Sequence, residues 1–119
     1  MQVFNNIFTD RGSRYAVAGG PAESREAVRA LLRDLTRRKK FAKATHHSWA
    51  ALLPEGPAKG DDGEAGAGTV ILQKLEGAGL ERHVVVVTRW FGGTKLGGDR
   101  FRRVADAVDY YLAHRSRGA

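Results

Sequence analysis

The apolar residues of this 119-residue chain predict that it begins with a two-stranded hairpin. Short apolar runs flank Asp10-Arg11-Gly12, and Gly12 suits the left-handed position of a hairpin loop. The first run contains Val3, Phe4, Ile7 and Phe8, and the second contains Tyr15, Ala16, Val17 and Ala18.

Three later segments have the pattern of helices. After Gly20-Pro21, and again after Asp99, apolar residues recur every three or four positions, which places them on one helix face. Between these two helices, Val70 to Leu75 predicts a short helix closed by Gly77 and Gly79. The apolar residues of the two longer helices are Val28, Leu31, Leu32 and Leu35, then Phe101, Val104, Ala105, Val108, Tyr111 and Leu112.

Two further strands separate the helices. Thr45 to Leu53 is one, and Val84 to Thr88 is expected to be a central strand buried on both faces. Pro54 to Gly60 is rich in proline and glycine and predicts an exposed, mobile loop that continues to Gly68.

The order hairpin, helix, strand, helix, strand, helix indicates an α+β fold of two layers, with the helices on one face of the sheet. Leu31, Leu35, Val104 and Val108 are expected to face that sheet.

The central strand leads into a glycine-rich loop before the last helix. This loop contains Gly92, Gly93, Gly97 and Gly98, and Arg89, Lys95 and Arg100 add positive charge. A helix N-terminus with such a loop can hold an anion, and glycines allow another backbone or a ligand to come close. The alternative is structural: the glycines supply positive φ and Asp99 caps the helix. The spacing is neither the P-loop pattern nor Gly-x-Gly-x-x-Gly.

Asp61, Asp62 and Glu64 form an acidic loop before the short helix. Three carboxylates can serve acid–base or divalent-cation chemistry, but acids before a helix more often stabilise its N-terminus.

The acidic and glycine-rich loops are expected to meet. Arg89 is expected to pair with Asp62 or Glu64, which would make it partly structural, and Trp90 to contact a partner. The residues expected to lie together are Asp62, Glu64, Arg89, Trp90, Lys95 and Arg100.

Composition argues against several chemistries. The chain has no cysteine, which excludes thiol catalysis and cysteine-ligated zinc. His46 and His47 point to opposite faces of a regular strand, so they cannot chelate one metal, and one of them is expected to hydrogen-bond beneath the loops. No catalytic residue, metal or cofactor is therefore predicted.

The formal net charge of +7 favours acidic partners such as RNA, the ribosome or an acidic protein surface. Along the first helix, basic residues recur every four positions and form either a nucleic-acid stripe or a solvated face. We name them the basic face: Arg25, Arg29, Arg33 and Arg37. The chain has no apolar run long enough to cross a membrane, so no membrane partner is expected. Cytoplasmic residence is expected.

Several motifs together resemble the Impact family, including its bacterial YigZ-type members. They are Ala44-Thr45-His46-His47, Asp61-Asp62-Gly63-Glu64, Arg89-Trp90-Phe91-Gly92-Gly93, Leu96-Gly97 and Asp99-Arg100-Phe101. The resemblance spans nearly the whole chain, so residues 1–119 are expected to form a single Impact-type domain. It implies a fold like that of a small-subunit ribosomal protein domain, and no catalytic residues are established for the family.

The resemblance also implies a role in translation. Eukaryotic members bind a ribosome-associated activator of a starvation-sensing kinase that phosphorylates an initiation factor, whereas bacterial members are linked to RNA or ribosomes. Three hypotheses follow: a non-enzymatic module that regulates translation through a protein partner, an RNA- or ribosome-binding module, and a phosphate-handling enzyme. Regulation ranks first, and the lack of a base–nucleophile pair counts against the enzyme.

Overall fold

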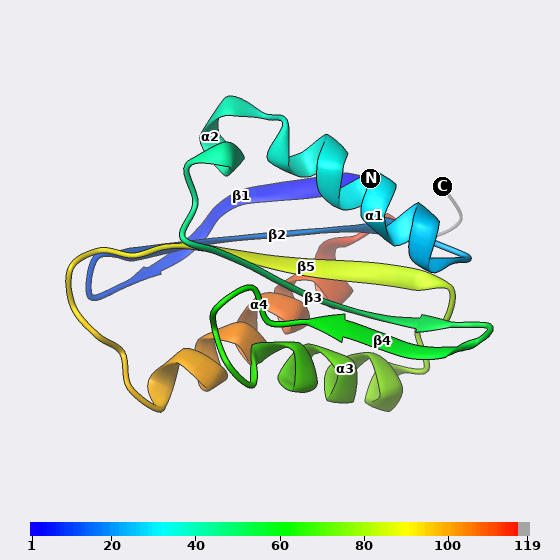
Figure 1. The fold of residues 1–119 in the computed structure, drawn as a ribbon. Helices are drawn as coiled ribbons and strands as arrows, with labels where there is room; N and C mark the ends of the chain where they lie inside the picture. Colours follow the sequence, from blue (N-terminus) through cyan, green and yellow to red (C-terminus); the bar gives the residue numbers. More distant parts are fainter. Residues whose placement is uncertain (117–119) are drawn as a thin grey trace.

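The computed structural model describes residues 1–116, which fold around one five-stranded antiparallel sheet of order β1-β2-β5-β3-β4 (Figure 1). The elements are β1 Gln2–Asp10, β2 Ser13–Pro21, α1 Arg25–Thr36, α2 Lys39–Ala42, β3 His46–Leu53, β4 Gly56–Gly60, α3 Ala67–Ala78, β5 His83–Trp90 and α4 Asp99–His114. The α+β class is therefore confirmed, as is the central position of β5.

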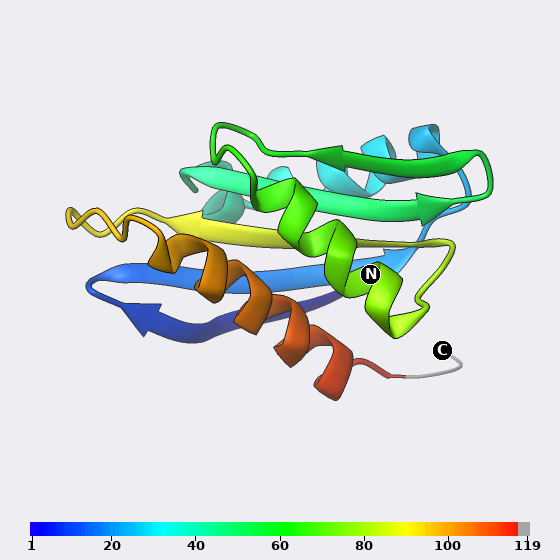
Figure 2. The same cartoon turned by 90° about the horizontal axis from the view of Figure 1, so that it is seen from below.

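The helices cover both faces of the sheet, so the expected arrangement of two layers with helices on one face is wrong. Helices α1 and α2 lie on one face, and α3 and α4 lie on the other (Figures 1 and 2). The reason lies in β5, whose residues are all buried. Val84 and Val86 pack in the core under α1, and Val85 and Val87 pack in the core against α3 and α4. A strand that is apolar on both faces needs a layer on each.

The helix residues that were expected to face the sheet do so from opposite sides. Leu35 is fully buried in the α1 core and Leu31 is partly buried against it. Val104 and Val108 are fully buried in the core of α3 and α4.

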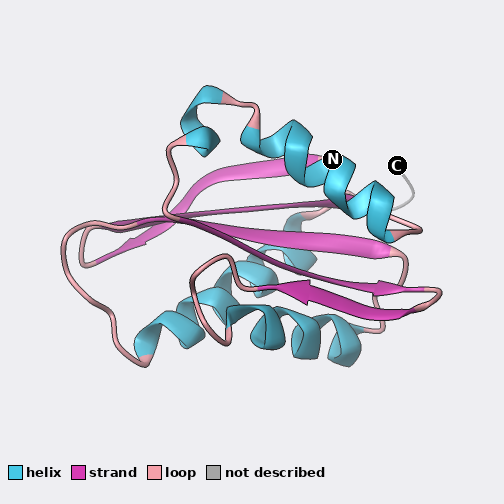
Figure 3. Ribbon diagram, viewed as in Figure 1, coloured by secondary structure: helices cyan, strands magenta, loops and turns pink. Residues whose placement is uncertain are grey.

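The segment from Pro54 to Gly60 is not a loop, because most of it forms the edge strand β4 (Figure 3). Leu53 pairs with Gly56, so Pro54 and Glu55 form a two-residue hairpin turn. Pro57 lacks an N–H donor, which an edge strand tolerates. Pairing with β3 thus prevails over a composition typical of loops.

Two features of the helices also differ from expectation. The short helix α2 was not predicted, and it buries Phe41 against the sheet. Asp99 is the first residue of α4 and the capping position belongs to Gly98, which has no side chain to cap with.

Candidate functional site

The site begins at the last two residues of β5, whose side chains leave the sheet on opposite faces. Arg89 points to the α3 and α4 side, where its Nη1 donates to Glu64 Oε1 at 2.5 Å. Arg89 is 6 % exposed and Glu64 is 4 % exposed. Arg89 Nε also donates to Ser13 Oγ at 3.3 Å. The expected pairing of Arg89 with the acidic loop is confirmed, with Glu64 as its partner.

Trp90 lies on the other face, in the core with α1 and α2, so it does not join this group. It is 7 % exposed, its Nε1 donates to Lys40 O at 3.2 Å, and its ring centroid lies 5.3 Å from that of Phe41. The expectation that Trp90 contacts a partner is therefore wrong, because its surface is already covered.

The exposed aromatic residue is the next one, Phe91, whose side chain is 47 % exposed. Sequence reasoning missed it. The signal was available, since Phe91 follows the end of the buried strand and begins the glycine-rich loop.

The glycine-rich loop is held against the turn between β1 and β2. A Cβ on Gly92 would lie 2.0 Å from the carbonyl carbon of Gly12, so only glycine fits there. Gly93 and Gly97 have φ of +93° and +58°, the left-handed region that favours glycine. These three glycines support the structural alternative for the loop.

The N-terminus of α4 offers few free donors. The N–H of Asp99 donates to Leu96 O at 3.1 Å, that of Arg100 to Gly97 O at 3.4 Å, and that of Phe101 to Gly98 O at 3.2 Å. Because these groups close the preceding turn, an anion bound here would depend on side chains.

A cleft of about 230 Å³ opens between the glycine-rich loop and β3. We call it the loop cleft; it is lined by His46, Arg89, Phe91, Lys95, Leu96, Gly97 and Arg100. The structure thus brings together Glu64, Arg89, Lys95 and Arg100, as expected.

Asp62 is turned toward the α1 side of this region. Its carboxylate accepts the His47 N–H at 2.8 Å, and it lines a separate cleft with Leu32, Thr36 and Trp49. The expectation that Asp62 shares the site of Arg89 is wrong for its side chain. Its backbone carbonyl still contacts His46 Nδ1 at 2.8 Å.

Asp61 stabilises the start of α3, which supports the structural interpretation of the acidic loop. Its carboxylate accepts the N–H groups of Gly66 at 3.1 Å and Gly68 at 2.8 Å, and these hydrogen bonds lower the pKa of Asp61. With Glu64 paired to Arg89, all three acidic side chains are engaged in contacts that hold the loop.

His46 is the histidine that hydrogen-bonds to the acidic loop and lines the loop cleft, as expected for one of the two histidines, whereas His47 contacts α2 on the other face. The Nδ1 of His47 is 2.9 Å from Thr88 Oγ1 and its Nε2 is 2.9 Å from Phe41 O. Burial lowers the pKa of His47. Within residues 1–116, no group of three or more His, Asp or Glu side chains is placed to hold a metal ion.

The basic face lies on the opposite side of the sheet from the loop cleft. All four of its arginines are exposed, and none forms an ion pair with a carboxylate of the described residues. Basic residues of α2 and its flanks extend this surface: Arg38, Lys39 and Lys43 are exposed as well.

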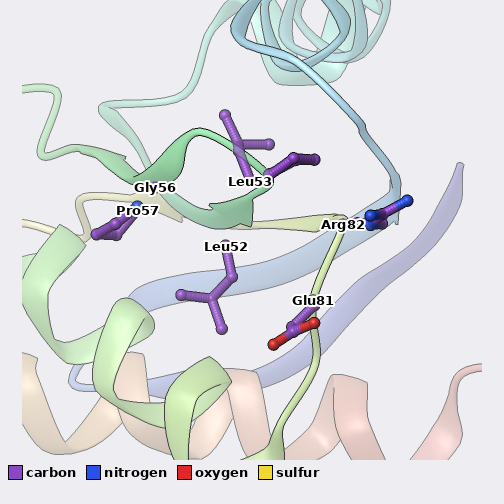
Figure 4. A pocket seen from close by; sticks show the side chains of 7 residues that line it. Leu52, Leu53, Gly56, Pro57, Glu81 and Arg82 are labelled. Atoms are coloured by element: carbon purple, nitrogen blue, oxygen red, sulfur yellow. The ribbon is translucent and has the colours of Figure 1, made fainter.

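A further cleft of about 250 Å³ lies at the other end of the sheet, beside the turn between β3 and β4 (Figure 4). Leu52 and Leu53 project to opposite sides there, and the charged lining residues are Glu81 and Arg82. Arg82 Nη1 lies 3.6 Å from Glu23 Oε1, in an exposed ion pair. Among the described helices, none is long and apolar enough to span a membrane.

Comparison with known proteins matches residues 11–112 to the Impact N-terminal domain. The chain is 38 % identical over 101 residues to Protein IMPACT homolog of Schizosaccharomyces pombe, covering 81 % of this chain and 36 % of that protein. It is 33 % identical over 114 residues to Protein IMPACT of Mus musculus, covering 91 % and 36 %. The chain thus spans about a third of the length of these curated relatives.

Two solved structures share the fold. A crystal structure of a hypothetical protein has a TM-score of 0.85 at 24 % identity and covers 96 % of this chain and 58 % of its own. The two-domain translational regulator Yih1 has a TM-score of 0.54 at 30 % identity, covering 87 % and 43 %.

Proposed function

The chain belongs to the Impact family, and from this premise we propose that it is a non-enzymatic binding module that regulates translation through a protein partner. The match over residues 11–112 carries the proposal. The likeness to Yih1, which is described as a translational regulator, supports the same role. More specifically, we propose that the partner is the activator of a starvation-sensing kinase that phosphorylates an initiation factor. By binding this activator, the module would prevent activation of the kinase.

The basic face supports binding to an acidic partner. Its arginines repeat every four residues along α1, are exposed, and have no acidic neighbour within ion-pair distance among residues 1–116. A complementary acidic surface would gain attraction and a faster encounter without first breaking internal ion pairs.

The contacts of the acidic loop support the non-enzymatic part of the proposal. Glu64 is neutralised by Arg89, Asp61 binds backbone N–H groups of α3, and Asp62 binds the His47 N–H. A carboxylate held in such contacts is poorly available as a general base. Phosphoester hydrolysis by the purified chain would contradict this part of the proposal.

The test is capture of partners by the immobilised chain from an extract of its own cells, with and without ribonuclease. We expect the chain to retain a protein partner after ribonuclease treatment, and this partner to bind the chain directly when both are purified. A variant with Arg25, Arg29, Arg33 and Arg37 all changed to Gln should lose it. If purified components do not bind and ribosomes are retained only without ribonuclease, the protein-partner proposal is wrong.

That last result would favour the second candidate, an RNA- or ribosome-binding module. The observation behind it is the same unpaired basic face, extended by Arg38, Lys39 and Lys43 at α2. Exposed cations in a row neutralise phosphates and release counterions.

A further inference from the structure

The loop cleft lies on the face of the sheet away from the basic face, and the proposed function makes no use of it. Its lining brings together three cationic side chains and one exposed aromatic ring: Arg89, Lys95, Arg100 and Phe91. Of the large apolar residues in the described part of the chain, only Met1 and Phe91 are exposed. An exposed aromatic ring next to cationic side chains contributes little to the stability of the fold, so its place here is better explained by a ligand that this cleft could bind.

The cleft has an excess of positive charge. Glu64 neutralises Arg89, but neither Lys95 nor Arg100 has a carboxylate within ion-pair distance among residues 1–116. The acid nearest in sequence, Asp99, is held by Arg11 at 2.7 Å. Two cations are therefore left to face the cleft.

Arg89, paired with Glu64, contributes a fixed side chain to the cleft rather than excess charge. Arg89 is only 6 % exposed. Its Nε donates a hydrogen bond to Ser13 and its Nη1 donates one to Glu64. It still lines the cleft, and its guanidinium carbon lies 5.7 Å from the centroid of the Phe91 ring. A buried guanidinium fixed in this way is a rigid part of the cleft floor.

The walls of the cleft are fixed in advance. Leu96 is 4 % exposed and anchors the loop in the core of α3 and α4. Gly92 rests on Gly12, and Arg100 is held by a 2.8 Å hydrogen bond to Gly97 O and by the Phe101 ring 4.4 Å away. A preorganised site loses less conformational entropy when a ligand binds.

We propose that the loop cleft binds a single unpaired nucleotide, with its phosphate held by Lys95 and Arg100 and its base stacked on Phe91. Cationic side chains form charge-assisted hydrogen bonds with phosphate, and an exposed aromatic ring stacks with any base. At about 230 Å³ the cleft is small for a whole nucleotide, so the phosphate enters it and the base lies outside on the exposed ring.

The nucleotide site goes beyond the proposed function and does not rest on it. It is lined by the glycine-rich loop that leads into α4, and it needs an aromatic platform that the basic face lacks. The same chemistry is offered by a free nucleotide and by an unpaired nucleotide within a single strand.

The test is fluorescence anisotropy with a labelled oligouridylate of about eight nucleotides, a length within the range of single-strand sites. Phe91→Ala should weaken binding roughly 5- to 150-fold by loss of stacking, and Phe91→Trp should retain it. Lys95→Gln and Arg100→Gln should weaken binding and each flatten the salt dependence by about 0.7 in slope. Arg102→Gln, an exposed change of equal charge on α4 outside the cleft, should bind like the unchanged chain.

Competition then separates the two sources. Displacement of the oligomer by uridine monophosphate indicates a free nucleotide, and displacement by longer strands alone indicates a strand; either supports the site. The proposal is overturned if the oligomer does not bind at low salt, if Phe91→Ala has no effect, or if Lys95→Gln and Arg100→Gln weaken binding no more than Arg102→Gln does. Circular dichroism melts of every variant confirm that loss of binding is not loss of folding.

Discussion

At the scale of single residues, the Arg89–Glu64 ion pair connects the acidic loop to the end of β5, where the glycine-rich loop begins. Both side chains are almost fully buried. Ser13 of the hairpin links the pair to the glycine-rich loop, because its Oγ accepts both the Arg89 Nε–H and the Gly92 N–H at 3.3 Å. Removing one partner of a buried pair leaves an uncompensated charge, whereas removing both leaves none.

Arg89→Ala should therefore destabilise the domain by about 3–5 kcal/mol, measured by chemical denaturation. The matched control is the double variant Arg89→Met with Glu64→Leu, which should recover much of the loss. A loss below about 1 kcal/mol for Arg89→Ala would show that the pair contributes little.

Trp90 and Phe91 should behave as a contrasting pair in the same assay. Trp90→Ala should cost about 3–5 kcal/mol, because the indole packs against Phe41 in the core. Phe91→Ala should change stability by less than about 1 kcal/mol, since its ring is half exposed. Equal losses would mean that Phe91 is a packing residue and would weaken its assignment as a stacking platform.

His83 introduces a pH dependence at a position outside both the basic face and the loop cleft. It is 8 % exposed, its Nε2 lies 2.5 Å from the Tyr111 hydroxyl, and burial lowers its pKa to about 4. The unfolded chain takes up this proton near pH 6.5, well before the folded chain does. The associated stability is complete above pH 6.5 and is lost as the pH falls toward 4.

Unfolding free energies measured between pH 7 and 4 should decline, with His83 contributing up to about 3 kcal/mol of that decline. The variant His83→Gln should show a shallower decline; the remainder includes His47, whose pKa burial also lowers. An unchanged slope in His83→Gln would contradict the assignment.

At the scale of elements, α1 is the single long helix on its face of the sheet among the described residues, so its packing rests on few side chains. Val28 and Leu35 are its fully buried residues. Ser24 caps its N-terminus by accepting the Ala27 N–H at 3.1 Å.

Leu35→Ala should destabilise the domain by about 2–5 kcal/mol through the cavity it leaves, measured by thermal or denaturant unfolding. Arg29→Ala, exposed on the same helix, should change stability by no more than about 0.5 kcal/mol. If the two variants are equally stable, α1 does not pack as described.

At the scale of the whole molecule, the sheet separates two surfaces of different character. One carries the exposed arginines of α1, and the other carries the loop cleft with its exposed aromatic ring. The net charge of +7 raises the encounter rate with any polyanion, while the two surfaces differ in what they can recognise.

Duplex RNA isolates the contribution of the basic face, since its paired bases cannot stack on Phe91. If the basic face binds RNA, affinity should fall steeply with salt, and each arginine changed to Gln should flatten the slope by roughly 0.7–0.9. Melting temperatures should stay nearly constant, because these arginines form no ion pairs with described carboxylates. Binding that is weak and insensitive to salt would leave them as a solvated surface.

Much of the fold was predictable because it depends on local pattern. The hairpin, α1, β3, β5 and α4 follow from apolar periodicity, and the all-buried β5 follows from its four consecutive valines. The pairing of Arg89 with the acidic loop was predictable from the order of the elements. The same alternation that separates His46 from His47 also separates Arg89 from Trp90, so the position of Trp90 could have been predicted.

The sequence by itself determined the class of fold, the central strand, the family and the two charged loops, because each depends on residue types and spacing along the chain. Tertiary structure decided which face each helix covers, that β4 pairs as an edge strand, and which carboxylate meets Arg89. It also decided that Phe91 rather than Trp90 is exposed. These outcomes depend on contacts between segments far apart in the chain, where burial and hydrogen-bond pairing outweigh local preference.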